Sequence, residues 1–485
     1  MRRAAANSIR RAVTRLPLTP LAAATLLQFS AAAHAATITV NDTGAGSVAG
    51  KCTLLDAVAA LNTAAPVNAC SAGDGSNDTI LLSFPTATPR AITFALPGSA
   101  DAKSALQIDR AVTLVGPLDS QGTPLVQLRR SSVSGTPSFR ILAATADTVV
   151  QGLSIAYGET SDQGGGVFAS GAANLTLRHT RVTNNTSLAS SGGGVAAECG
   201  NILLQHATIA ANSAYNGGGG VYTSNSSGGS ACSSTITLQD AIVSGNSTAH
   251  GTSGGIYSFN GAVVGDRSSI DGNASTTSAI GGIGAYGSIT LTNSTVSNNS
   301  AALTWGGLSS ATITLLNTTV SGNHSGARGG AFGGKNLTLY LCTVTDNISD
   351  AADGSAVFFD THAQIVGDIV HGNTPFDFFS SHAATVSGGY NIIASSSATY
   401  QAPLPPDTLD CDPQLGPLAN NGGPTLTMLP GLGSCAIDAG PPAVPPTVAS
   451  DQRGELFERI YGSASDVGAV EIQPNDRVFY DGFGI

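Results

Sequence analysis

The feature that most constrains the fold of this chain is a block of the form Val/Ile-x-x-Asn, which recurs eight times. Successive asparagines are separated by 27, 34, 27, 26, 24, 24 and 26 residues. A repeat of this length is typical of solenoids, in which each turn buries its apolar side against the next. The aligned asparagines are Asn185, Asn212, Asn246, Asn273, Asn299, Asn323, Asn347 and Asn373.

Apolar residues precede each asparagine at fixed distances. Val or Ile stands three residues before it in every copy, and Leu, Ile or Val stands eight and ten residues before it in nearly every copy. The positions at eight and ten have the two-residue period of a strand with one buried face. The residue just before each asparagine is Asn, Ala, Gly or Asp, and in most copies it is Gly or Asn. Those two residue types tolerate the left-handed backbone of a sharp bend.

These patterns predict an all-β fold, a right-handed parallel β-helix (solenoid). Each coil should contain a strand, a bend, a second strand, a second bend, and a third short strand after a glycine pair, as in GGGVYTS. Stacking would place like residues above like and turn the asparagines into a ladder of side-chain amides.

Both ends of such a solenoid need protection, because an open coil exposes unpaired backbone groups. At the N-terminal end, the segment from Thr53 to Asp56 fits a capping box and should open a short helix that covers the first coil. Towards the C-terminus, QAPLPPD and PPAVPP interrupt the repeat, so residues 401–472 should form a loop-rich capping module.

Charge and the first residues bear on location and on partners. Residues 1–35 carry five arginines, an apolar run and the small-x-small end Ala33-His34-Ala35, which predicts a cleaved signal peptide. The Arg10-Arg11 pair also raises a twin-arginine export route, although its flanking residues fit that motif poorly. Cleavage would leave 15 basic and 31 acidic residues, a net charge of −16 with three lysines. Such a chain lacks the clustered cations that nucleic acids and anionic lipids require, so neither is expected as a partner.

Seven cysteines in an exported chain should mostly pair. Cys52 with Cys70, and Cys411 with Cys435, each lie within one local segment, and Cys199 and Cys232 lie about one repeat apart. We therefore predict three disulfides and a buried free thiol at Cys342.

Three segments resemble known families. KCTLLDAVAALNTAAPVNACSAGDGSNDTILL resembles the CSLREA domain, with Leu55 in place of its arginine and Asp56 in place of its glutamate. DPQLGPLANNGGPTLTMLPGLGSCAIDAG resembles the choice-of-anchor Q domain, and the GGGVY and SGN units resemble the repeats of polymorphic outer-membrane proteins. The resemblance covers nearly the whole chain after residue 35. It implies an exported bacterial β-helix protein and does not define a biochemical activity.

The resulting domain organisation has five parts. Residues 1–35 are the signal peptide, 36–110 the CSLREA-like cap and first coils, 111–400 the β-helix repeats, and 401–472 the choice-of-anchor Q-like module. The tail at 473–485 ends in a Phe-x-Asp-Gly-Phe pattern found on exported proteins of some Gram-negative bacteria. It is either a sorting element or a plain C-terminal strand.

An aromatic row is the main candidate for binding. The residue two positions after the glycine pair is aromatic in five coils, which would give a row of exposed rings suited to sugar stacking or to a partner surface. A register error of one residue would place the rings inside instead. The row consists of Phe168, Tyr222, Tyr257, Phe332 and Phe358, with Ala196, Gly284 and Ser309 as gaps.

Three other groups of polar residues are better explained by a structural role than by a binding or catalytic one. A corner stripe stands six residues before the asparagines and contains His179, His206, Asp240, Arg267, Asn293 and Asn317. Charges in the C-terminal module favour an ion-paired cluster and comprise Asp438, Asp451, Arg453, Arg459, Asp466 and Glu471. The loop SDAADGS, with Asp350 and Asp353, lacks the alternating oxygen ligands of a calcium site.

The sequence therefore predicts a secreted or cell-surface protein exported from a Gram-negative bacterium and acting as a non-enzymatic adhesion or interaction scaffold. Its partner would be a polysaccharide or another surface protein, with no cofactor, metal, catalytic residue or transmembrane segment expected, and a monomeric state. The alternative is a polysaccharide lyase or glycoside hydrolase. The repeat acids do not fall in one column, which disfavours the converging carboxylates that a hydrolase needs.

Overall fold

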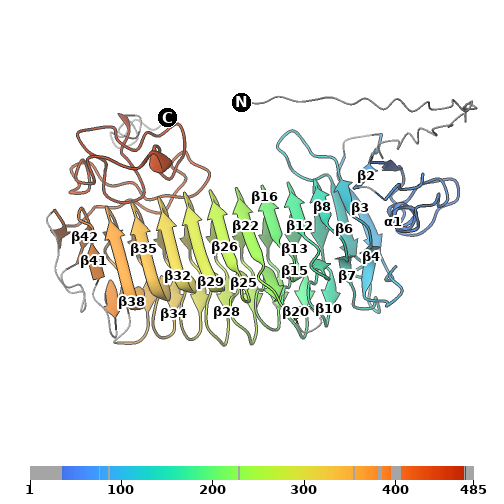
Figure 1. The fold of residues 1–485 in the computed structure, drawn as a ribbon, viewed down its shortest axis with the longest axis horizontal. Helices are drawn as coiled ribbons and strands as arrows, with labels where there is room; N and C mark the ends of the chain where they lie inside the picture. The colour runs from blue at the N-terminus through green and yellow to red at the C-terminus, as the bar shows by residue number, and fades with distance from the viewer. Residues whose placement is uncertain are drawn as a thin grey trace, which may run out of the picture. The chain divides into compact units, whose positions relative to one another are not determined.

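The chain forms a parallel β-helix, seen in a computed structural model that describes residues 35–476 except 76, 86–87, 225, 228–229, 353–354, 381–384, 395–405 and 475. The predicted signal peptide, apart from Ala35, lies outside the described residues, as does the tail beyond residue 476. Successive coils pair in parallel with matched register, for example Leu175 with Ile202 and Ile202 with Ile236. The predicted parallel β-helix is confirmed (Figure 1).

The largest sheet carries two strands per coil in the N-terminal half of the stack. One ladder runs through β12, and the other, which begins after the glycine pair, runs through β11; they merge in the long strands β29, β32, β35 and β38. Among the described residues this sheet has 20 strands. They are β1 (Thr37–Val40), β2 (Asp78–Leu82), β4 (Ser104–Ile108), β5 (Val112–Val115), β7 (Arg140–Ala144), β8 (Thr148–Gln151), β11 (Val167–Ala169), β12 (Leu175–Arg178), β15 (Val195–Glu198), β16 (Ile202–Gln205), β19 (Val221–Ser224), β22 (Thr235–Gln239), β25 (Ile256–Ser258), β26 (Ala262–Asp266), β29 (Ile283–Thr292), β32 (Leu308–Leu316), β35 (Phe332–Tyr340), β38 (Val357–Val366), β40 (Phe378–Ser380) and β41 (Thr385–Ser387).

Two further sheets complete each coil. The second sheet holds the Val or Ile that stands three residues before each asparagine. The third sheet is built from two-residue strands, one just after the asparagine in successive coils, which the repeat did not predict. The second sheet comprises β3 (Arg90–Phe94), β6 (Val126–Arg130), β9 (Leu153–Ala156), β13 (Arg181–Thr183), β17 (Thr208–Ala210), β23 (Ile242–Ser244), β27 (Ser269–Asp271), β30 (Thr295–Ser297), β33 (Thr319–Ser321), β36 (Thr343–Thr345), β39 (Ile369–Val370), β42 (Ile392–Ile393) and β43 (Thr408–Leu409). The third comprises β10 (Glu159–Thr160), β14 (Thr186–Ser187), β18 (Ser213–Ala214), β24 (Ser247–Thr248), β28 (Ala274–Ser275), β31 (Ser300–Ala301), β34 (His324–Ser325) and β37 (Ile348–Ser349).

The core consists of the columns read from the repeat. Val182, Ile209 and Val243 are fully buried, as are Leu175, Ile202 and their equivalents along the stack. Each residue before a ladder asparagine has a positive φ, from 54° at Ala211 to 75° at Gly372. The left-handed bend turns the chain so that the asparagine side chain points inward.

The eight asparagines form a continuous ladder, in which all but the last, Asn373, are buried. In Asn299, for example, Nδ2 donates to Asn323 Oδ1 and to the Ile270 carbonyl, both at 2.9 Å. Its Oδ1 accepts from the backbone N–H and the Nδ2 of Asn273, at 3.0 and 2.9 Å. Every hydrogen-bonding group of the amide therefore has a partner. The ladder ends at Asp377, which accepts from the backbone and side chain of Asn373.

The N-terminal helix α1 (Leu54–Thr63) packs against β1, β2 and β4. Thr53 is its N-cap, and the Thr53 hydroxyl oxygen accepts from the Asp56 N–H at 3.3 Å. Asp56 does not complete a capping box. Its Oδ2 accepts from the Thr53 and Ser47 hydroxyls and from Asn68 Nδ2. The acid thus joins the helix start to the loops on either side of it.

Replacing Thr53 by alanine should weaken α1 by about 1–2 kcal/mol, because the first helical turn loses its side-chain acceptor. We expect hydrogen exchange of the α1 amides to accelerate by roughly 5–30-fold. The conservative variant Thr53→Ser keeps the hydroxyl and should exchange at nearly the native rate. Equal exchange in the two variants would mean that the hydroxyl does not stabilise the helix.

The C-terminal module is loop-rich, with short bridges and one 3-10 turn, η1 (Pro446–Val448). Its hydrogen bonds run to the flank of the second sheet. Gln452 binds the hydroxyls of Thr319 and Thr295, and the Ala469 N–H donates to the Thr343 hydroxyl. The module therefore lies along the side of several coils, where Figure 1 draws it beside the C-terminal half of the stack.

The three predicted disulfides, Cys52–Cys70, Cys199–Cys232 and Cys411–Cys435, are present, and Cys342 is a buried free thiol. Three disulfides are typical of a protein that folds in an oxidising compartment. No helix within the described residues has the length and apolar character needed to cross a bilayer.

Candidate functional site

The outward-facing residue after the glycine pair forms one column along the large sheet. The strand register joins Phe168, Ala196, Tyr222, Tyr257, Gly284, Ser309, Gly333 and Phe358 in that order. Aromatic residues occupy both ends of a stretch whose middle three positions are small. The predicted row is therefore interrupted where Gly284, Ser309 and Gly333 form a floor.

Phe332 does not belong to this column, and its assignment as an exposed ring was wrong. It is fully buried, and it pairs with the inward residues Leu308 and Val357. The glycine pair at 329–330 is displaced by one position, because Ala331 stands where the preceding coil has Gly307. A displacement of one residue moves a side chain to the opposite face of a strand. Gly333 takes the outward position instead.

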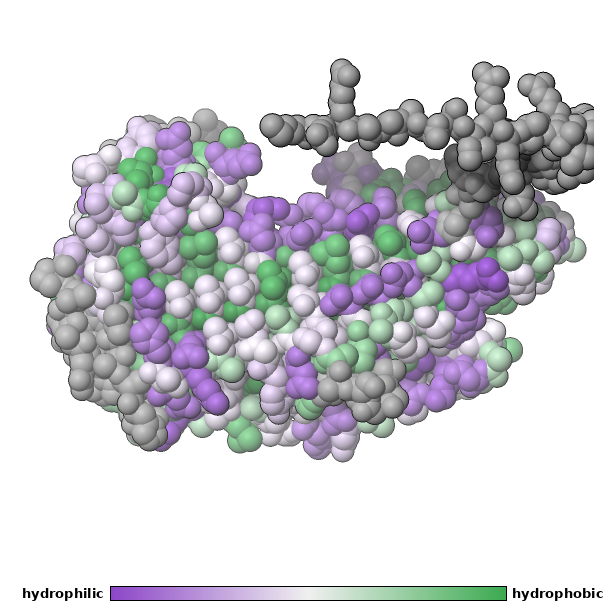
Figure 2. All heavy atoms as spheres, in the orientation of Figure 1, coloured by the Kyte–Doolittle hydropathy of each residue, from purple (hydrophilic) through white to green (hydrophobic). Residues whose placement is uncertain are grey.

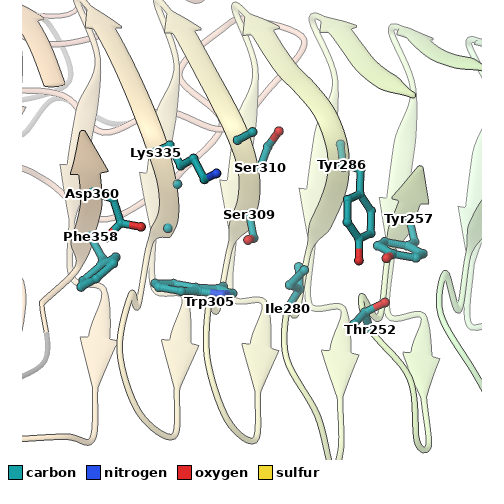
Figure 3. Close-up of a pocket in the computed structure, with 14 residues that line it drawn as sticks. Thr252, Tyr257, Ile280, Tyr286, Trp305, Ser309, Ser310, Lys335, Phe358 and Asp360 are labelled. Atoms are coloured by element: carbon teal, nitrogen blue, oxygen red, sulfur yellow. The ribbon is translucent and has the colours of Figure 1, made fainter. Parts of the chain in front are cut away.

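The small floor and its aromatic ends enclose an open trough of about 490 Å³. This volume lies within the range of small-molecule binding sites in proteins. Tyr257 and Tyr286 stand at one end, with ring centroids 6.4 Å apart, while Phe358 and Trp305 stand at the other, 5.3 Å apart. Figure 3 shows Trp305 edge-on between Phe358 and Ile280. In Figure 2, apolar and weakly polar residues are mixed across the middle of the coils.

Trp305, the chain's single tryptophan, is an aromatic residue of the trough that the sequence analysis did not identify. Its ring lies against the backbone of β35, since a Cβ at Gly333 would approach ring atom Cε3 to 2.0 Å. Only glycine at position 333 allows this arrangement. In the sequence, Trp305 stands just before a glycine pair, whereas the predicted aromatic row stands two residues after the pair.

The column that contains Trp305 holds an unusual backbone conformation. The residue aligned with Trp305 has a positive φ in coil after coil, and it is glycine at positions 164, 192, 218 and 329. At the trough it is Ile280, with a φ of 68°, and Trp305, with a φ of 62°. A large or β-branched residue in this region costs about 1–2 kcal/mol. Ile280 and Trp305 are therefore held at the trough in a backbone conformation that the equivalent glycines of other coils adopt without this cost.

The trough offers hydroxyl groups and one opposed pair of charges. Lys335 and Asp360 lie on its rim, and Ser309, Ser310 and Thr252 contribute hydroxyls. Burial raises the pKa of Tyr257 to about 12, so its phenol remains a neutral hydrogen-bond donor at physiological pH. The lining is thus apolar rings plus uncharged donors and acceptors, with little net charge.

The other predicted candidates are placed elsewhere. In the corner stripe, His179 and His206 stack at 4.8 Å, and Arg267 binds Asp240 through two hydrogen bonds. The Asp350 carboxylate accepts from Nε2 of the His324 ring at 2.9 Å, while Asp353 lies outside the described residues. No group of three or more His, Cys, Asp or Glu side chains in the described part of the chain is placed to hold a metal ion.

Of the charges predicted for the C-terminal cluster, Asp451, Arg453, Arg459, Asp466 and Glu471 are buried and Asp438 is exposed, and their ion pairs centre on Arg453. Arg453 lies between Asp451 and Asp476, with 2.8 Å contacts to each. Arg459 donates to the carbonyls of Asp466 and Gly468. Burial raises the pKa of Glu471 to about 7, and Asp466 nearby adds to that effect. The cluster is remote from the trough and contains no nucleophile with an adjacent base.

Comparisons with known proteins add little beyond this geometry. No family model matches the chain, and no curated protein matches it. Among solved structures, the crystal structure of pectate lyase Pel9A aligns with 13% sequence identity and a TM-score of 0.41. The alignment covers 90% of this chain and 98% of the lyase chain. The fold assignment above rests on the strand pairing itself.

Proposed function

We propose that this protein is a surface or secreted β-helix that binds a polysaccharide of low charge in the trough, without cleaving it. The single observation that carries the proposal is the pairing of Trp305 and Phe358 at one end of a small-residue floor with Tyr257 and Tyr286 at the other. Aromatic faces bind the apolar faces of sugar rings, and serine and threonine hydroxyls suit sugar hydroxyls.

The length of the trough fits a chain ligand. Tyr257 and Phe358 are separated by four register steps, or about 19 Å at the usual spacing of paired strands. A span of this length suits a ligand that extends along the stack of coils. The balanced charges of Lys335 and Asp360, within a strongly acidic chain, favour a ligand with few negative charges.

Export and surface location are part of the same proposal. The three disulfides support an extracellular environment, and the resemblance to the CSLREA and choice-of-anchor Q domains supports a surface protein. Attachment through the C-terminal tail rests on its sequence pattern alone.

The proposal is tested by titrating soluble neutral glucans, mannans and xylans into the protein. Trp305 reports binding directly through its fluorescence, because it is the chain's only tryptophan. Trp305→Ala should weaken binding, measured by calorimetry, at least tenfold, which corresponds to 1.4 kcal/mol or more. Ser309→Trp, which fills the floor without removing a ring, should weaken binding similarly. Tyr461→Ala removes an exposed ring in the C-terminal module and should leave affinity unchanged.

The enzymatic alternative has its own readout in the same experiment. Release of reducing ends or unsaturated sugars from any polymer would show catalysis and would direct attention to Lys335 and Asp360, the charged residues on the rim. Binding that survives both Trp305→Ala and Ser309→Trp would place the ligand outside the trough and contradict the proposal.

A further inference from the structure

A second hollow lies on the same face of the large sheet, near its N-terminal end. Its volume is about 510 Å³, and its lining includes Phe168 together with Lys103, Arg140, Asp101 and Asp162. Phe168 is also the first aromatic residue of the outward column that runs to the trough. The two hollows therefore share one line of residues, in which Tyr222 lies between Phe168 and Tyr257 and stacks on Tyr257 with ring centroids 6.0 Å apart.

Arg140 is the unusual residue of this hollow. It is 4% exposed, and its guanidinium lies 4.8 Å from the centre of the Phe168 ring. Buried guanidinium groups normally bind a carboxylate through two short hydrogen bonds. Here Nε is buried without a partner among the described residues, and the closest carboxylate oxygen, of Asp162, is 3.8 Å from Nη2.

The neighbouring acids are engaged elsewhere. The same oxygen of Asp162 is 2.9 Å from Lys103 Nζ. Asp101 accepts from the Ser99 hydroxyl at 2.6 Å and from the Lys103 N–H at 3.0 Å. Gln163, also in the lining, has a buried Oε1 without a partner in the described part of the chain. The hollow thus presents an under-paired cation beside an aromatic ring and an unused hydrogen-bond acceptor.

We propose that this second hollow binds a carboxylate-bearing sugar, a uronic acid unit, with Arg140 on the carboxylate and the Phe168 ring against the sugar. A uronic acid unit supplies all three complementary groups, since it has an anionic oxygen pair, hydroxyl donors and an apolar ring face. Arg140 would act as the specificity-determining residue for acidic units.

This inference deepens the proposed function. Phe168 and Tyr257 are separated by three register steps, or about 14 Å, so an acidic unit in the second hollow would be joined to the trough by a few sugars. The expected ligand is therefore a mostly neutral polysaccharide with widely spaced acidic units. A polyuronate would place a carboxylate at every unit of the trough, where Lys335 is the only cation among the described lining residues.

The test uses two small probes, methyl glucuronoside and methyl glucoside, followed by ligand-observed NMR with the full chain. Methyl glucuronoside should bind, and Arg140→Gln should weaken it at least tenfold. Arg140→Lys retains the charge but not the planar fork, so it should recover only part of the affinity. Arg181→Gln removes an exposed arginine from the second sheet and serves as the matched control, with binding unchanged.

Three outcomes separate this inference from the proposed function. Trp305→Ala should weaken polymer binding in the trough at least tenfold while leaving methyl glucuronoside binding intact, which would support a separate second hollow. Equal binding of methyl glucuronoside and methyl glucoside, or full binding in Arg140→Gln, would overturn the inference alone, provided that neutral polymers still bind the trough. Acetate binding as tightly as methyl glucuronoside would show that no sugar is recognised and would overturn it as well. Retained polymer binding by Arg140→Gln establishes that this variant is folded.

Discussion

Asn299→Ala is expected to lower the free energy of unfolding by about 4 kcal/mol, because several buried polar groups lose partners at once. The backbone N–H and Nδ2 of Asn273 lose their acceptor, and the Ile270 carbonyl and Asn323 Oδ1 each lose a donor. Each unsatisfied buried group costs about 1–3 kcal/mol, partly offset by local relaxation. Chemical denaturation followed by circular dichroism measures the loss.

Two variants make the ladder test specific. Asn299→Asp retains the acceptor but places an oxygen against the Ile270 carbonyl and Asn323 Oδ1, so it should be at least as destabilising as alanine. Asn336→Ala changes the same residue type at an exposed position of β35 and should alter stability by less than about 0.5 kcal/mol. Comparable losses at positions 299 and 336 would mean that the ladder does not stabilise the solenoid.

The second large effect concerns pH and the buried carboxyl of Asp368. Burial raises the pKa of Asp368 from 3.8 to about 8, against the opposing effect of the Cys342 and Val366 N–H groups that donate to its oxygens. At pH values between 3.8 and 8 the folded protein therefore holds a proton that the unfolded chain releases. The contribution of Asp368 to stability is therefore fully present at low pH and is lost as pH rises through this window.

The size of the pH effect follows from the same linkage. One retained proton changes stability by 1.36 kcal/mol per pH unit, so between pH 5 and pH 8 Asp368 alone should lower the free energy of unfolding by about 2–4 kcal/mol. Asp368→Asn cannot ionise and should remove this slope. Both Asp368 oxygens accept from backbone N–H groups, and asparagine offers only one acceptor. The variant should therefore be less stable than the native protein at pH 5, and the difference should narrow as the pH rises to 8.

Glu471 provides an internal comparison with Asp368. Burial raises the pKa of Glu471 to about 7, so its contribution to the pH dependence of stability should end about one pH unit below that of Asp368. Glu471→Gln should flatten the profile only below pH 7, and Asp368→Asn should flatten it up to pH 8. Denaturation midpoints at pH 5, 6, 7 and 8 resolve the two. An unchanged slope in Asp368→Asn would show that this carboxyl is ionised in the folded protein throughout.

The trough illustrates why the site was only partly predictable. Tyr257 was found because its spacing from the glycine pair matches the repeat, and Phe332 was misplaced for the same reason. Its coil has Ala331 where the second glycine is expected, and only pairing with Leu308 and Val357 reveals the displacement. Trp305 was missed because it reaches the trough across Gly333, a contact between neighbouring coils.

By itself the sequence determined the features that repeat. The Val and Ile columns, the asparagine ladder and the left-handed bends follow from local spacing, because each coil meets a near copy of itself and like residues must stack. The three disulfides also followed from the sequence, because their cysteines lie close along the chain or about one repeat apart. The tertiary structure alone decided the features that do not repeat. These are the position of the C-terminal module along the second sheet, the inward turn of Phe332, and the placement of Trp305 and Arg140 beside residues from other coils. Such contacts depend on the register between segments far apart in the chain, and no local pattern encodes that register where the repeat is broken.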